Sequence, residues 1–101
     1  MESISKSLGR ILKGRRLQLD MSQATVARLS GKAQAQIANL ENGLGDPRLS
    51  SVVQVSRALG CEVVLVPVRL VPTVRSLIED RVLSNRKLVG NDPEDEEDDD
   101  E

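Results

Sequence analysis

The chain has 101 residues, enough for one small domain, and it contains no Phe, Tyr or Trp. It has no histidine and a single cysteine, Cys61, which excludes a His/Cys metal site and an intrachain disulfide and favours a reducing compartment. The net charge of -2 is unevenly distributed along the chain. Residues Asp92 to Glu101 hold nine acidic residues and no basic residue. The other 91 residues hold all 14 basic residues and seven acidic residues, a net charge of about +7. A basic body of this kind favours a polyanionic partner such as nucleic acid.

The N-terminal segment predicts a helix from Ile4 to Leu19. Apolar residues recur there at helical spacing, at Ile4, Leu8, Ile11 and Leu12. Ser22 then has the position and chemistry of an N-cap, because its hydroxyl can accept a hydrogen bond from an unpaired amide of the following helix.

The stretch from Gln23 to Gly43 predicts two short helices joined by a tight turn at Gly31, where glycine can adopt a positive φ. The residues expected to face inward are Val26, Ala27, Ile37 and Leu40. The second of these helices, residues 33–42, carries an outward row of small or amide side chains: Gln34, Ala35, Gln36, Asn39 and Asn42. Amides suit the reading of base edges, since one group offers both a donor and an acceptor. We interpret the pair as a helix-turn-helix; the alternative is an ordinary helical hairpin with polar residues facing water.

Asp46 and Pro47 are a further helix-start signal, and apolar residues from Leu49 to Leu59 predict a fourth helix that ends at Gly60. Four helices can close a compact core. The predicted fold class is therefore an all-α, four- to five-helix helix-turn-helix domain over residues 1–60, followed by one short β-strand.

That strand is predicted in residues 61–70, where CEVVLVPV is β-branched and almost entirely apolar. A lone strand leaves its backbone amides and carbonyls without partners, so we expect it to pair with the same segment of a second copy and form a homodimer. The expected dimerisation residues are Glu62, Val63, Val64, Leu65 and Val66. Such a dimer would present two recognition helices about 34–36 Å apart to an inverted-repeat operator. The alternative is an extended segment packed on the helices.

Residues 71–90 predict a basic helical or extended segment after Pro72, and residues 91–101 predict a disordered acidic tail. One hypothesis is that this tail competes with DNA for the basic surface. The alternative is that it only increases solubility.

Three stretches, GRRLQLDMSQATVA, QIANLENG and DPRLSSVVQVSRALG, resemble the helix-turn-helix domain of the phage-repressor (Xre/Cro) family. The resemblance implies base contacts by Gln34, Ala35 and Asn39, with Gln36 as a further candidate, backbone contacts by Gln23 and Asn42, and a buried ion pair between Arg16 and Glu41. The chain departs from the family at Lys32, where an apolar residue is usual, and at Ala33, which replaces a Ser or Thr cap.

Basic residues that border the motif are candidates for contacts to DNA phosphates, each contributing about 0.9 to the salt slope of binding. They are Arg10, Lys13, Arg28, Lys32 and Arg48. Without aromatic residues the chain cannot stack single-stranded bases, which favours double-stranded DNA over single-stranded RNA.

The sequence RALGCEVVLVP, which joins the fourth helix to the predicted strand, resembles the HipB-like branch, whose members are antitoxins that repress their own operon and bind a toxin kinase. The expected function is thus a transcriptional repressor with DNA, a second copy and a toxin kinase as partners. The alternatives are a plain phage-type repressor and a protein-interaction adaptor that uses the helical domain as a scaffold.

Catalysis is not expected, because there is no Gly-rich phosphate loop and Cys61 has no histidine base. No cofactor and no small-molecule ligand are indicated. No apolar run reaches membrane-spanning length and the N-terminus lacks the apolar core of a signal peptide, so a cytoplasmic protein without membrane contact is expected.

Overall fold

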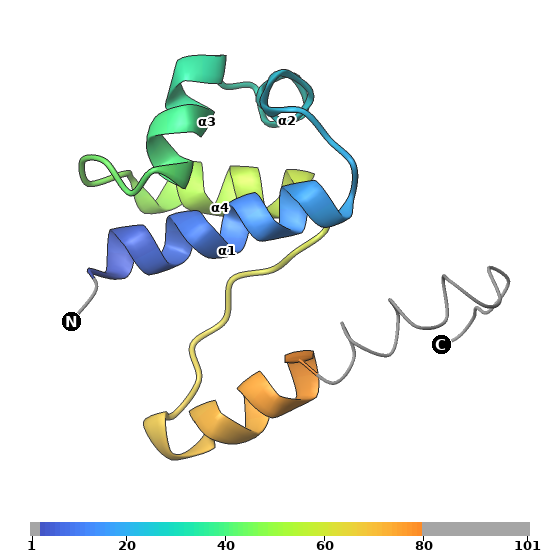
Figure 1. Ribbon diagram of the computed structural model, residues 1–101. Helices are drawn as coiled ribbons and strands as arrows, with labels where there is room; N and C mark the ends of the chain where they lie inside the picture. The colour runs from blue at the N-terminus through green and yellow to red at the C-terminus, as the bar shows by residue number, and fades with distance from the viewer. Residues whose placement is uncertain (1–2, 80–101) are drawn as a thin grey trace, which may run out of the picture. The chain divides into compact units, whose positions relative to one another are not determined.

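The computed structural model describes residues 3–79. The chain divides into two compact units, Met1–Val64 and Leu65–Glu101, and each is described by itself. The elements (Figure 1) are α1 (Ile4–Gln18), α2 (Gln23–Ser30), α3 (Gln34–Glu41), α4 (Leu49–Ala58) and the short 3-10 helix η1 (Val68–Leu70), followed by helical residues 71–79. The predicted acidic tail, residues 91–101, and the end of the predicted 71–90 segment lie outside the described residues.

The helix ends follow local side-chain chemistry. Ser22 is the N-cap of α2, as predicted, and its Oγ accepts a hydrogen bond of 3.0 Å from the amide of Thr25. Gly31 ends α2 in the left-handed conformation, with φ 72°, which confirms the predicted turn. The fourth helix begins at Leu49, later than the Asp46-Pro47 signal suggested, because Arg48 is still extended and acts as its N-cap.

Four helices enclose one core, as predicted. Its buried apolar residues are Leu12, Val26, Ala27, Ile37, Leu40, Val52, Val55 and Leu59. All four inward-facing residues predicted in α2 and α3 are among them. In the described residues α3 packs on α1 and on α2, and α2 packs on α4.

The buried side of α1 differs from its most apolar stripe. Gly9, Leu12 and Arg16 are the buried residues of this helix, whereas Ile4 and Ile11, whose spacing located it, are 85% and 65% exposed. Gly9 lies against the C-terminal end of α3: a Cβ atom there would stand 2.5 Å from the carbonyl oxygen of Glu41 and would also clash with that of Leu40. The absence of a side chain at position 9 therefore sets how closely α1 and α3 approach.

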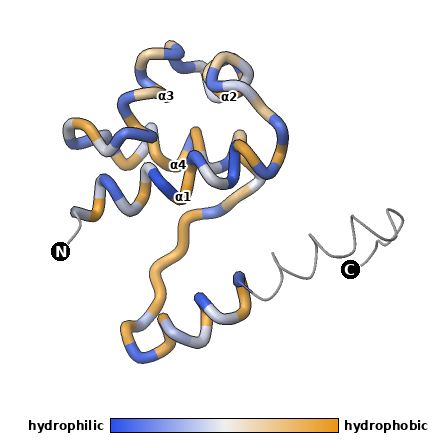
Figure 2. The backbone as a smooth tube through the Cα atoms, in the orientation of Figure 1, coloured by the Kyte–Doolittle hydropathy of each residue, from blue (hydrophilic) through white to orange (hydrophobic). Residues whose placement is uncertain are grey.

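The predicted β-strand is not formed. In the part of the chain that is described, residues 61–67 have no regular secondary structure, and η1 occupies Val68–Leu70, inside the predicted strand. A strand needs a partner ladder, and a single chain supplies none here. The segment remains hydrophobic (Figure 2), and the side chain of Leu65 is 99% exposed.

Glu62, one of the expected dimerisation residues, has a partner within the single chain. Both of its carboxylate oxygens accept hydrogen bonds from Arg57 at the end of α4, at 3.0 and 3.2 Å. This exposed pair ties the start of the extended segment to α4.

In the second unit, residues 71–79 form a helix in which Val71 and Val74 are half-buried, whereas Leu77 and Ile78 are exposed. Within residues 3–79, no helix combines the length and apolar character needed to cross a bilayer.

Candidate nucleic-acid interface

The outward side of α3 carries the predicted base-reading residues. Its inward side is formed by Ile37, Leu40 and Glu41, all buried. Ala35, Asn39 and Asn42 follow one another by four and three residues, so they share one exposed face of the helix. Gln34 and Gln36 flank that face and are exposed as well. The structure therefore brings the five predicted residues together on one solvent-facing side of a helix whose other side is fixed in the core.

Gln36 also caps the start of α3. Ala33, the N-cap, has no side-chain acceptor; this is the departure from a Ser or Thr cap noted in the sequence. The backbone amide of Ala33 donates to Oε1 of Gln36 at 2.9 Å. This is the reciprocal half of a capping box, in which the third residue of the helix reaches back to its cap. The sequence contained this signal, a glutamine three residues after the cap position, but only the base-reading role was considered.

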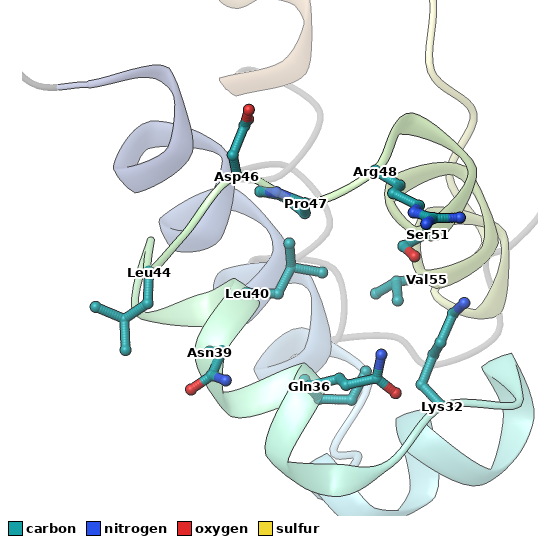
Figure 3. A pocket seen from close by; sticks show the side chains of 11 residues that line it. Lys32, Gln36, Asn39, Leu40, Leu44, Asp46, Pro47, Arg48, Ser51 and Val55 are labelled. Atoms are coloured by element: carbon teal, nitrogen blue, oxygen red, sulfur yellow. The ribbon is translucent and has the colours of Figure 1, made fainter.

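A hollow of about 320 Å³ lies beside α3, between the turn before it and the start of α4 (Figure 3). It is lined by Lys32, Gln36, Ile37, Asn39, Leu40, Leu44, Asp46, Pro47, Arg48, Ser51 and Val55. Four of these residues were predicted to contact DNA, two as base readers and two as phosphate contacts. Ser51, in the first turn of α4, was not predicted; no sequence signal separated it from the other serines of that helix.

The Arg16 and Glu41 side chains form a buried ion pair that joins α1 to α3. Arg16 Nε donates to Glu41 Oε2 at 2.6 Å and Nη2 donates to Oε1 at 3.0 Å. Nη1 donates to the carbonyl oxygen of Met21, in the connection to α2, at 2.9 Å. The two side chains are only 10% and 4% exposed. One guanidinium thus joins α1, the connection to α2, and α3.

Gln23, the first residue of α2, joins the same network. Its Nε2 donates to Glu41 Oε1 at 3.0 Å. Burial raises the pKa of Glu41, but hydrogen bonds from Arg16 and Gln23, together with the positive charges of Arg16 and Lys13, outweigh it and hold that pKa below its usual range. The carboxylate therefore stays ionised at neutral pH and keeps the Gln23 amide in one orientation at the start of α2, where the resemblance implies a DNA backbone contact.

The remaining predicted phosphate contacts lie on several elements. Arg10 and Lys13 are exposed on α1, Arg28 is exposed in the last turn of α2, and Asn42 is the exposed C-cap of α3. Residues 3–64 hold nine basic and four acidic residues, a net charge of +5. Of the predicted phosphate contacts, Lys32 and Arg48 line the hollow beside α3.

Gly9 is the residue of structural importance that the sequence interpretation missed. It has no chemistry of its own, but it sets the distance between α1 and the end of α3, and therefore the position of the exposed face. The resemblance already implied that Arg16 is buried, and Gly9 lies seven residues before it, on the same side of α1; that spacing was the available signal.

Comparison with known proteins agrees with this arrangement. Residues 12–66, which contain α2, the turn at Gly31, α3 and α4, match the family described as helix-turn-helix. The chain is also similar to an HTH-type transcriptional regulator, y4dL, of Sinorhizobium fredii (strain NBRC 101917 / NGR234), at 39% identity over 77 residues. That alignment covers 69% of this chain and 39% of the relative, so the chain spans well under half of the relative's length. The matched segment includes more than half of the chain, and the protein belongs to the helix-turn-helix family.

Proposed function

We propose that this protein is a cytoplasmic, sequence-specific regulator of transcription that binds double-stranded DNA through α3. The observation that carries the proposal is the exposed amide-bearing face of α3 on a helix that is locked in place by the core and by the Arg16–Glu41 pair. A helix fits the major groove, where each base pair presents its own pattern of donors and acceptors. The net charge of +5 over residues 3–64 supports a polyanionic partner. The Sinorhizobium relative is named as an HTH-type transcriptional regulator, which supports the proposed role in transcription.

Replacing both Gln34 and Asn39 by alanine should greatly reduce the preference for selected over unrelated DNA. The full chain would be used to select sites from a random duplex library, and binding to the selected site would be measured for the wild type and the double variant. Good amide contacts to bases contribute about 1–3 kcal/mol of discrimination each, so we expect the affinity ratio to fall by at least tenfold. Binding to unrelated duplex should change little, because phosphate contacts remain.

The control is Gln54→Ala, which removes an exposed amide from α4 and should leave the ratio unchanged. A double variant that still selects the same site with wild-type preference would contradict the proposal. Wild-type binding that is equal for all duplexes would contradict it as well.

The finer proposal is that the regulator acts as a homodimer joined through residues 62–66. The apolar, extended and exposed segment after α4 supports it, because Val64 and Leu65 are 70% and 99% exposed in the single chain and would be covered by a second copy. Pairing two such segments would also satisfy their backbone groups. The resulting two-fold axis would match an inverted-repeat operator.

Val64→Pro should convert the dimer to a monomer in analytical ultracentrifugation. Proline removes one backbone donor from the ladder and cannot take part in the centre of a paired strand. Val64→Thr is the control, because it keeps the β-branched shape and the amide, and it should stay dimeric. A wild-type chain that sediments as a monomer, or a proline variant that remains dimeric, would contradict pairing through this segment.

The proposed antitoxin role rests on the resemblance of residues 48–68 to the HipB-like branch. Under this proposal the protein represses its own operon and binds a toxin kinase. A kinase-like gene next to its own would support it, whereas a neighbouring phage lysis module would favour a plain phage-type repressor. An adaptor that uses the helices only as a scaffold would show no sequence preference in the selection described above.

A further inference from the structure

The capping bond at the start of α3 restricts what Gln36 can recognise. Building on the proposed function, we propose that Gln36 is a specificity-determining residue that presents only a hydrogen-bond donor to DNA, and that it selects guanine and rejects cytosine at the base it faces.

The argument begins with the chemistry of the cap. A backbone N–H can be satisfied only by an acceptor, so the amide of Ala33 fixes which end of the Gln36 side chain turns inward. The oxygen Oε1 takes this bond at 2.9 Å, and the amide nitrogen Nε2 is left facing away from the backbone. Because Ala33 has no side chain that could supply the acceptor, rotating the Gln36 amide would leave that N–H without this partner.

The position of Gln36 makes the exposed nitrogen relevant. Gln36 shares the hollow beside α3 with Asn39, Lys32 and Arg48. In Figure 3 its nitrogen points into this hollow, while its oxygen points to the side of the turn that carries Lys32. The donor thus lies between a predicted base reader and two predicted phosphate contacts.

This geometry gives Gln36 a base preference that differs from that of a glutamine whose amide is free. A free glutamine pairs with adenine by donating to N7 and accepting from the N6 amino group. The Oε1 of Gln36 is directed at the Ala33 amide, so it cannot lie beside Nε2 against the base and the two-bond adenine arrangement is lost. Guanine presents two acceptors in the major groove, N7 and O6, and cytosine presents an amino donor that would oppose Nε2. Gln34 and Asn39 have no hydrogen bond of this kind among the described residues, and their amides remain able to turn either way.

The test is Gln36→Glu, which has nearly the same shape but replaces Nε2 by an oxygen. The glutamate can still accept from the Ala33 amide, and a glutamate at this position near a helix N-terminus is favourable, so the fold is preserved and a thermal melt should show it. Sites would be selected from a random duplex library with the full-length wild type, with Gln36→Glu and with Gln54→Glu. The last variant adds the same charge at an exposed glutamine of α4 that has no predicted contact to DNA.

In the wild type we expect one position of the selected site to favour guanine over cytosine by about tenfold. In Gln36→Glu that position should reverse to cytosine, whose amino group donates to a carboxylate, while Gln54→Glu should leave it unchanged. A site whose sequence does not respond to Gln36→Glu, or which has adenine at the responding position, would overturn the inference alone. Failure of the wild type to enrich any sequence would overturn the proposed function together with it.

Discussion

Replacing Gly9 by alanine should destabilise the four-helix unit by about 1–3 kcal/mol or more, even though alanine is the better helix former. A Cβ atom at this position would stand 2.5 Å from the carbonyl oxygen of Glu41 and would also meet that of Leu40. Both neighbours are backbone atoms, so no side chain can rotate away and α1 and α3 must move apart. Thermal unfolding followed by circular dichroism should show a clearly lower Tm.

The same helix supplies the control. Gly14 also lies within α1, but it is exposed and a Cβ atom there would have no neighbour within 4 Å. Gly14→Ala should therefore raise stability by about 0.4–1 kcal/mol, because it reduces the freedom of the unfolded chain without a clash. Equal effects of the two substitutions would show that the close approach at Gly9 does not limit the packing of α3.

Gly9→Ala should also weaken selective DNA binding at temperatures where the variant is folded. The added methyl group displaces the end of α3, and the exposed face moves with it. Gly14→Ala should bind as the wild type does. This difference would separate a positioning effect of Gly9 from a general effect of α1 stability.

The contrast between Gly9 and the rest of α1 shows what the sequence could predict. Helix boundaries and the core of α2 and α3 follow from periodicity, caps and turn residues, and these predictions were confirmed at Ser22 and Gly31. Periodicity could not identify the buried side of α1, since its apolar stripe includes the exposed Ile4 and Ile11. The buried side contains a glycine and an arginine, residues that hydrophobic patterns count as exposed or disruptive.

The candidate site was also predictable only in part. The residues of the exposed α3 face could be named from the sequence, because small and amide side chains alternate there with the core positions. The side-chain bonds that orient them could not, since Gln36 and Gln23 each have a partner that depends on three-dimensional proximity: the Ala33 amide and the Glu41 carboxylate. The predicted β-strand is not formed in the single chain, because apolar β-branched sequence indicates an extended segment but does not supply a partner.

Arg16→Ala should lower stability by about 3–5 kcal/mol, a large part of the 5–15 kcal/mol that stabilises a typical domain. The substitution removes the two hydrogen bonds to Glu41 and the one to Met21. Among residues 3–79, the buried carboxylate would then keep only Gln23 as a hydrogen-bond donor. Urea denaturation at neutral pH measures the loss directly. An unfolding free energy within 1 kcal/mol of the wild type would show that the pair is not part of the scaffold.

A second variant keeps this prediction interpretable if Arg16→Ala fails to fold. Replacing both partners, as Arg16→Met with Glu41→Met, removes the buried charges together, and such exchanges are often neutral or stabilising. We expect this double variant to recover most of the lost stability. It should not recover operator affinity, because Gln23 has lost the carboxylate that orients its amide at the start of α2. Stability restored without affinity would mean that the ion pair fixes the DNA-binding geometry as well as the fold. If both return, the pair acts on binding only through stability.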